Sequence, residues 1–397
     1  MDINAPRGVL RCFGDMKDPR QNSGKRHPLI SMIVIAISAI LCGSDGWKDI
    51  AEFGRIRKKW FESFLDLPHG IPSACTFGRV FARLDPDAFE TCFRQWMQAL
   101  SQDSGGKLVA VDGKTLRRSF DTAAKKSAIH MVSAWCQSNQ TVLGQIVCDD
   151  KSNEIPTVPA LLELLDIGGA VVTGDAMHCQ KKTTQVIIGK SADYVLQVKD
   201  NQPQLHEDLQ LLFDQGMRKD CHGVPFDYAK VVEKGHGRID TRECWTTWNT
   251  SWITDHANWA GLQSVARVRR TCVTGDKTSV EDRYFISSLS GRDAERILSL
   301  ARGHWSIENQ LHYSLDVTFF EDQRRIRVGH AAENYSRLSR MALNILKTDV
   351  QLSVQNDVRQ SMIGGPLSKT TSLRARRKIA SWDPDYLLHL LTLELKS

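Results

Sequence analysis

The sequence predicts an α/β protein whose mixed sheet is preceded and followed by helices. Two observations carry this prediction. Between residues 108 and 215, short apolar runs of strand length alternate with longer stretches of helical spacing, whereas residues 1–100 show helical spacing alone. Residues 216–292 differ from both, because four strand-like runs separated by polar turns follow one another there before helical spacing returns at Asp293.

The overall composition is that of a globular chain. The protein has 397 residues, of which 41% are hydrophobic and 25% charged. The first long apolar run, residues 29–42, is too short to span a bilayer and predicts a buried helix, so we expect no signal peptide and no membrane partner. The ten cysteines form no C-x-x-C pair and no zinc-site spacing, which is typical of reduced thiols in the cytoplasm.

The first 100 residues predict a helical domain. Pro28 suits the first turn of the apolar helix that follows it. Further along, Ile50, Phe53, Ile56 and Trp60 recur at helical spacing with basic residues between them. The aromatic residues here suit a core better than a base-stacking surface, and we expect at most a DNA contact from this domain.

The order of elements in residues 101–215 indicates a particular fold. Three strands come first, and a helix, a strand, a helix, a strand and a final helix follow. This β-β-β-α-β-α-β-α order is that of a ribonuclease-H-like domain, in which the first and fourth strands lie side by side. We expect residues 293–350 to complete this core, residues 216–292 to form a β-rich insertion, and residues 351–397 to form a basic, helical C-terminal segment.

Two of the predicted strands end in an aspartate. The run 108–111 leads to Asp112, and the run 170–173 leads through Gly174 to Asp175. A carboxylate at the end of a core strand needs a cationic partner, and Mg²⁺ prefers oxygen ligands. Either aspartate alone could equally be a helix cap or a turn residue. Their adjacency in the predicted fold favours a metal site.

A third carboxylate is offered by the helical stretch 304–312. Its apolar stripe continues through Leu315, and His304, Glu308 and His312 share the adjacent face. Glu308 would complete an acidic triad, although an ordinary exposed helix glutamate has the same pattern. The two histidines leave open a transition metal such as zinc.

Positive charge is concentrated toward the end of the chain. The net charge is +6, and residues 323–397 hold 13 Lys or Arg against 6 Asp or Glu. The remaining 322 residues therefore sum to −1. A basic segment on a near-neutral body favours a polyanion partner, and a solvated helical surface is the alternative.

Several short motifs, taken together, resemble a known family. They are Asp18-Pro19-Arg20, Arg26-His27-Pro28-Leu29, Gly70-Ile71-Pro72-Ser73, Val111-Asp112-Gly113-Lys114, Lys151-Ser152-Asn153-Glu154-Ile155, Asp175-Ala176-Met177, Lys199-Asp200-Asn201-Gln202, Gly235-His236-Gly237-Arg238 and His304-Trp305-Ser306-Ile307-Glu308-Asn309. In this order they resemble the insertion-sequence transposases of the H-repeat-associated kind, which belong to the group with a DDE catalytic triad.

The resemblance implies a catalytic and metal-binding triad of Asp112, Asp175 and Glu308, separated by 63 and 133 residues. The wide second gap is similar to that of relatives with a β-rich insertion before the glutamate. Such relatives cleave and join DNA strands with two Mg²⁺ ions, for which Mn²⁺ can substitute. Better-understood relatives carry Tyr, Arg and Lys where Ala301, His304 and Leu315 stand here, so the handling of strand ends is expected to differ.

The resemblance also implies double-stranded DNA as partner, both as terminal inverted repeats and as target, with a homodimer on DNA in the bacterial nucleoid. The residues expected to contact DNA are Lys114, Arg117, Arg118, Lys199, Arg238, Arg302, Arg324, Arg325, Arg374, Arg376 and Arg377. Two alternatives are a ribonuclease-H-like nuclease without strand transfer and an inactive or domesticated DNA-binding remnant.

Overall fold

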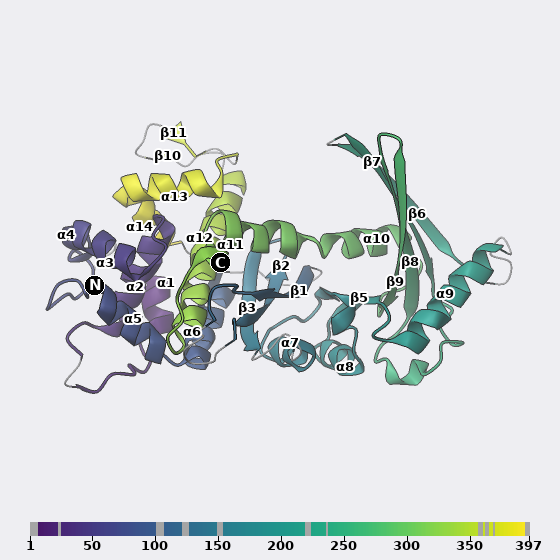
Figure 1. Cartoon of the computed structure of the whole chain (residues 1–397), viewed down its shortest axis with the longest axis horizontal. Helices are drawn as coiled ribbons and strands as arrows, with labels where there is room; N and C mark the ends of the chain where they lie inside the picture. Colours follow the sequence, from purple (N-terminus) through teal and green to yellow (C-terminus); the bar gives the residue numbers. More distant parts are fainter. Residues whose placement is uncertain are drawn as a thin grey trace.

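The computed structural model describes residues 7–22, 25–100, 107–120, 127–148, 154–218, 224–235, 237–355, 360–361, 365–367 and 370–393. In these residues a nine-stranded sheet lies between helical layers, with a bundle of helices at one end of the long axis and a tall β extension at the other (Figure 1). The expected α/β class is confirmed. No helix among the described residues is long and apolar enough to cross a membrane.

The sheet has the order β3-β2-β1-β4-β5-β9-β8-β7-β6. Its first five strands are β1 (Leu108–Thr115), β2 (His130–Cys136), β3 (Thr141–Cys148), β4 (Val171–Gly174) and β5 (Asp193–Val198). Strand β1 pairs antiparallel with β2 and parallel with β4. The first and fourth strands are therefore neighbours, as the order of elements predicted.

The β-rich part of the chain continues this same sheet. Its strands are β6 (Asp227–Gly235), β7 (Arg238–Thr247), β8 (Ser264–Thr274) and β9 (Lys277–Ser287). Strand β9 pairs antiparallel with β5, with Val195 opposite Ser287, and β6 to β9 form a meander that projects beyond the helices (Figure 1). The insertion is thus an extension of the central sheet and not a separate layer.

Alternate residues of the strands face two different helical layers. Val109 and Val111 pack in one core with α7 (Glu154–Glu163) and α8 (Lys181–Gly189), whereas Ala110 packs in the core of the helical bundle. Helix α10 (Ala294–Gly303) contacts β4 to β7 and lies on the bundle's side of the sheet. Helix α9 (Pro203–Arg218) packs against β9.

The helices before and after the sheet share one hydrophobic core. The N-terminal helices are α1 (Arg7–Phe13), α2 (Leu29–Leu41), α3 (Trp47–Ile56), α4 (Lys58–Phe61), α5 (Ala74–Arg83) and α6 (Pro86–Leu100). The C-terminal elements are α12 (Ala331–Gln355), the strand pair β10 (Gln360–Ser361) and β11 (Gly365–Pro366), α13 (Leu373–Trp382) and α14 (Pro384–Leu391). The Arg377 guanidinium donates to the carbonyl of Ile40 at 2.8 Å, and Arg57 donates to the carbonyl of Ser381 at 2.7 Å. The two ends of the chain therefore build one helical body.

Candidate metal centre

The pairing of β1 with β4 brings Asp112 and Asp175 together. The parallel register sets Val111 opposite Gly174. The residue that follows each of them is an aspartate, Asp112 within β1 and Asp175 directly after β4, so both lie at the same edge of the sheet. The absence of a side chain at Gly174 lets His178 pack closely against the end of β4, since a Cβ at position 174 would lie 3.2 Å from the Cβ of His178. Both aspartates line one cavity of about 460 Å³.

Glu308 reaches the same cavity from the other side. It lies in a turn of π-helix, η5 (Ile307–His312), between α10 and α11 (Tyr313–Val317). Such turns are frequent at functional sites because they re-aim the side chains around them. His312 Nδ1 lies 3.4 Å from Glu308 Oε2 and 3.7 Å from Asp112 Oδ2. One ligand atom from each of Asp112, Glu308 and His312 lies within 4.8 Å of the others, which is a spacing that a metal ion can bridge.

The pKa values of the three carboxyl groups in the site are shifted in different directions. Burial raises the pKa of Asp112 to about 7, and the negative charge of Asp175 adds to this effect. A hydrogen bond with His304, whose Nε2 lies 3.3 Å from Asp175 Oδ1, lowers the pKa of Asp175. The contact with His312 likewise lowers the pKa of Glu308. Asp112 is therefore the carboxyl that most needs a cation to remain ionised.

The donor set fits a divalent cation. Three carboxylates and the imidazoles of His304 and His312 line the cavity, and Asp316 adds a fourth carboxylate. Carboxylate oxygens suit Mg²⁺ and Mn²⁺, while a histidine nitrogen is a better ligand for Mn²⁺ or zinc than for Mg²⁺. The two imidazoles therefore leave the zinc alternative open, beside four carboxylates that suit Mg²⁺ or Mn²⁺.

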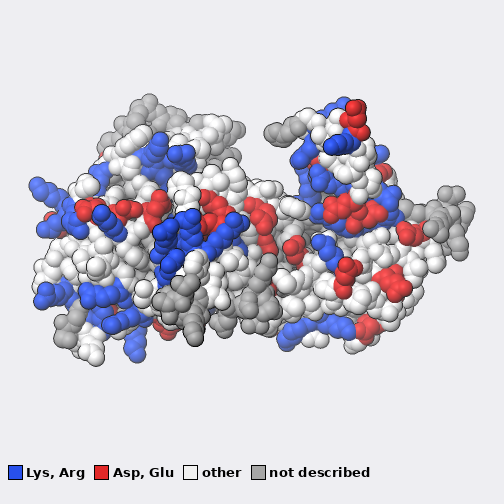
Figure 2. Space-filling model, viewed as in Figure 1, with Lys and Arg blue, Asp and Glu red and all other residues white. Residues whose placement is uncertain are grey.

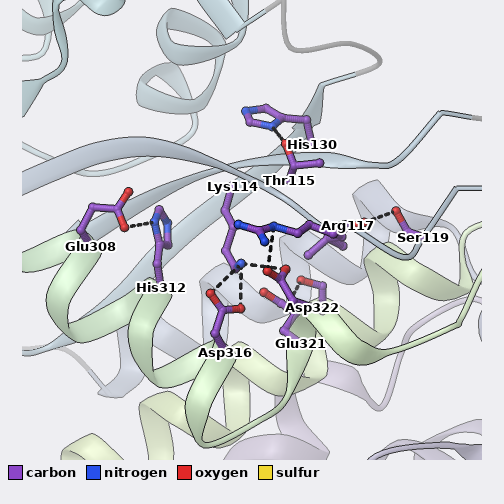
Figure 3. A network of polar contacts seen from close by, with 12 residues as sticks. Lys114, Thr115, Arg117, Ser119, His130, Glu308, His312, Asp316, Glu321 and Asp322 are labelled. Carbon is purple, nitrogen blue, oxygen red and sulfur yellow. Dashed lines mark hydrogen bonds and ion pairs between the residues drawn. The ribbon is translucent and has the colours of Figure 1, made fainter.

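Lys114 does not lie where a phosphate could reach it. Its ammonium is only 8% exposed and donates to Asp316 on α11 and to Asp322, with Nζ–Oδ1 distances of 2.8 and 3.0 Å (Figure 3). The expectation that Lys114 contacts DNA is wrong in this structure, because both its charge and its donors are used within the protein. The contact instead ties β1, which carries Asp112, to the segment that carries Glu308.

We expect Lys114→Met to lower both stability and cation affinity. The substitution removes the cation that Asp316 and Asp322 share and leaves only Arg117 beside Asp322, which should cost about 1 to 3 kcal/mol of unfolding free energy. Mn²⁺ affinity, measured by calorimetry on folded protein, should fall about tenfold because Glu308 loses its fixed position. Arg118→Met, an exposed residue at the end of the same segment, is the control and should change neither quantity. An unchanged Mn²⁺ affinity for Lys114→Met would contradict the positioning role.

Three of the predicted DNA contacts are structural arginines. Arg376 is fully buried against Asp349, and the buried Arg377 donates to main-chain carbonyls of Ile40 and Thr318. Arg324 stacks over the Tyr335 ring at 4.5 Å and donates to Ser339. For these three the expected DNA contact is wrong, because desolvated guanidinium groups with internal partners cannot meet a phosphate.

The remaining predicted DNA contacts lie on the surface. Arg117, Arg118, Lys199, Arg238, Arg302, Arg325 and Arg374 are exposed. Arg117 pairs with Asp322, Arg238 with Asp240 and Arg302 with Glu233. Lys199 lines a smaller cavity that also contains Asp175 and His304. Their contact with DNA stays a prediction.

The sequence did not predict a buried polar cluster of His130, Glu154 and His178 next to the strand that carries Asp112. Glu154 at the start of α7 pairs with His130 of β2, and His178 Nε2 lies 3.6 Å from the same carboxylate. Gly113 makes room for it, since a Cβ there would lie 2.2 Å from His130 Nε2 and 2.7 Å from Glu154 Oε2. The sequence held two signals, the glycine directly after Asp112 and the motif of residues 151–155 that contains Glu154, but neither indicated a buried polar cluster.

Comparison with known proteins identifies the family. The family described as "Transposase DDE domain" matches residues 103–345, and the "DDE_Tnp_1-associated" family matches residues 10–97. The chain belongs to the DDE-domain transposases. The DDE match contains all three predicted triad residues, and the associated match covers most of the N-terminal helices.

Similar individual proteins show to which kind of DDE transposase the chain is related. "Putative transposase YncI" of Escherichia coli O157:H7 is 38% identical over 345 residues, covering 85% of this chain and 87% of the relative. The "H repeat-associated putative transposase YhhI" of E. coli K12 is 36% identical over 346 residues, covering 86% and 90%. The expected membership in the H-repeat-associated kind is confirmed.

Among solved structures, one similar chain is that of a piggyBac transposase in a synaptic complex with hairpin DNA. The TM-score is 0.46 and the sequence identity 11%, with 97% of this chain and 81% of the other covered.

Proposed function

We propose that this DDE-family protein is an active transposase that cleaves DNA strands and transfers them during movement of an insertion sequence. The observation that carries the proposal is the meeting of Asp112, Asp175 and Glu308 in one cavity, from three separate parts of the chain. The strand order β3-β2-β1-β4-β5, with β2 antiparallel to β1, supports a ribonuclease-H-like core around this site.

The carboxylates would hold two Mg²⁺ ions, with Mn²⁺ as a substitute. Asp112 is central, because it neighbours both Asp175 across the strands and Glu308 across the cavity. His304 orients Asp175 and in turn lies 3.2 Å from Thr173 Oγ1, while His312 orients Glu308. Bound ions would activate the attacking water or 3′-hydroxyl and stabilise the leaving oxygen. The protein's own contribution is to hold three like charges close enough to need those ions.

Double-stranded DNA, as terminal inverted repeats and as target, is the proposed partner. The exposed basic residues described above would contact its backbone, which positions the duplex without reading its sequence. We propose a homodimer on DNA, since two ends must be paired, and a location on the bacterial nucleoid. The buried Arg324, Arg376 and Arg377 have no part in this surface.

The test is cation-dependent cleavage of a duplex that carries the ends of the protein's own element. Glu308→Gln should reduce cleavage by about 10³-fold or more in Mg²⁺, since one ligand of the cation is lost, while DNA affinity in EDTA stays within about twofold. Glu295→Gln, which makes the same change on the exposed first turn of α10, is the matched control and should cleave normally.

Each other outcome has a definite meaning. Equal cleavage by wild type and Glu308→Gln would remove Glu308 from the catalytic set. Cleavage without joining of the cut ends to a target would support a nuclease without strand transfer. Specific end binding with no cleavage by wild type would support the DNA-binding remnant. One relative is itself named "Inactive transposase YbfQ", and it is 32% identical to this chain over 66 residues.

A further inference from the structure

A basic cavity of about 710 Å³ lies between α10 and the β extension, next to the metal centre. Among the residues that the structure describes, five arginines and two acidic residues line it. They are Arg238, Arg242, Arg270, Arg283, Arg302, Glu233 and Asp240. In Figure 2 Lys and Arg gather on the β extension beside α10, with acidic residues among them. The excess positive charge fits a polyanion.

The strands place like charges directly opposite one another here. Glu233 of β6 faces Asp240 of β7, and Arg242 of β7 faces Arg270 of β8. Such pairs destabilise a sheet by a few tenths of a kcal/mol to about 1 kcal/mol. The like charges are compensated here by ion pairs with neighbouring residues, Glu233 with Arg242 and Asp240 with Arg270. Two guanidinium groups therefore lie side by side at the wall of this cavity, each held by one carboxylate.

Glu233 joins the two sides of the cavity. Arg242 Nη1 donates to its Oε2 at 2.8 Å from the sheet, and Arg302 of α10 donates to its Oε1 from the other side. Asp240 is held in the same manner, 2.6 Å from Arg270 Nη2 and 3.0 Å from Arg238 Nε. A carboxylate between two guanidinium groups makes the contacts that a phosphodiester oxygen pair would make. Glu233 is 40% exposed, so its two ion pairs are weak enough to exchange, whereas Asp240 is only 7% exposed.

The basic cavity is continuous with the carboxylate site. Trp305 and Asn309 line both, and Arg283 stacks over the Trp305 ring at 5.3 Å. A DNA strand with its reacting phosphate at the carboxylates would therefore lay neighbouring phosphates in the basic cavity. This step rests on the proposed function.

We propose that the basic cavity binds the sugar-phosphate backbone of the DNA strand next to the reacting phosphate. In the DNA-free protein Glu233 occupies the position of one phosphate between Arg242 and Arg302. Binding of DNA exchanges the carboxylate for that phosphate, so Glu233 holds the arginines in place and also competes with DNA. The contact is to the backbone and is independent of base sequence.

The test measures binding of the full-length protein to a short fluorescein-labelled duplex of arbitrary sequence, by anisotropy in EDTA, where no cleavage takes place. Glu233→Gln should tighten binding about 3- to 10-fold, because a competing charge is removed and two guanidinium groups are released. Arg302→Ala should weaken binding and lower the slope of log K against log salt by about 1.

Glu243→Gln is the matched control. It removes the same charge from β7, but Glu243 follows Arg242 and so points to the opposite face of the sheet, where it accepts from the Tyr228 hydroxyl at 2.7 Å. It should change binding by less than half as much as Glu233→Gln does. In a protein that also carries Arg242→Ala and Arg302→Ala, Glu233→Gln should no longer tighten binding.

Three results would overturn the inference. They are equal effects of Glu233→Gln and Glu243→Gln, tightening by Glu233→Gln that persists without the two arginines, and an unchanged salt slope for Arg302→Ala. If wild type cleaves DNA while any of these occurs, only the inference fails. If wild type binds no DNA even at low salt, the proposed function fails with it. Circular dichroism of each variant establishes that the fold is intact.

Discussion

Asp112→Asn is expected to abolish cation-dependent DNA cleavage and, at the same time, to stabilise the cation-free protein. Loss of the central ligand should reduce the cleavage rate by about 10³-fold or more. The stability gain follows from the electrostatics, because the buried carboxyl faces Asp175 and Glu308 and its pKa is raised to about 7. Asparagine keeps the shape of the side chain and removes the charge.

The stabilisation should depend on pH in a defined direction. Because the folded-state pKa of Asp112 is above the unfolded value, the folded state binds the proton more tightly between about pH 4 and pH 7. The unfolding free energy of the wild-type protein therefore falls as the pH rises through that window, because Asp112 must ionise in the folded state. In EDTA, Asp112→Asn should be more stable than wild type by about 2 kcal/mol at pH 8 and by much less at pH 4.

Denaturant unfolding at the two pH values measures this difference. Added Mn²⁺ should stabilise wild type at pH 8 and have little effect on Asp112→Asn, since ligand binding to the folded state alone raises stability. If Asp112→Asn were less stable than wild type at pH 8, the ionised carboxylate of Asp112 would not destabilise the cation-free folded state. Full cleavage activity in the variant would exclude Asp112 from the centre.

Arg376→Met is expected to give the largest loss of stability. Arg376 is fully buried on α13 and forms an ion pair with Asp349 of α12, which also accepts from the Tyr386 hydroxyl at 2.7 Å. Burial alone would raise the pKa of Asp349, but hydrogen bonds from His389 and Tyr386 and the charge of Arg376 hold it below its usual value. Removing the guanidinium leaves a buried carboxylate without its cation, at a cost of about 3 to 5 kcal/mol.

The same helix offers a control for Arg376→Met. Arg374→Met changes an exposed arginine two residues earlier and should alter the unfolding free energy by no more than about 0.5 kcal/mol. Urea unfolding followed by circular dichroism compares the two. Adding Asp349→Leu to Arg376→Met should recover part of the loss. A loss below about 1 kcal/mol for Arg376→Met would mean that water reaches Asp349.

The difference between Arg374 and Arg376 shows what the sequence could not predict. Both belong to one basic run whose charge count favoured a polyanion partner, yet only one of them reaches the surface. Charge content is a local property, whereas burial depends on acidic partners far away in the chain, such as Asp349 for Arg376. The basic bias of residues 323–397 therefore says less about DNA than about the interior of the helical body.

The candidate metal centre was easier to predict than its surroundings. Asp112 and Asp175 end short apolar strands, and the order of elements alone made those strands neighbours. The helical spacing of residues 304–315 predicted that Glu308 lies beside the apolar face of a helix. The π-helical turn that orients its side chain was not predicted, because it has no sequence signature. The pairing of β5 with β9 could not be predicted either, because it joins residues about 90 positions apart through strands that have the same local pattern as a separate β domain.

The shared core of the first and last helices has a consequence for synthesis of the protein. The N-terminal helices leave the ribosome before the C-terminal ones, and part of their apolar surface packs against α12, α13 and α14. Contacts such as Arg377 with Ile40, 337 residues apart, give this body a high contact order, which slows folding. Until α13 and α14 have been made, the apolar surface of the N-terminal helices stays exposed to aggregation. A gene copy that stops before α13 would leave this core open, even though every residue of the metal centre had been made.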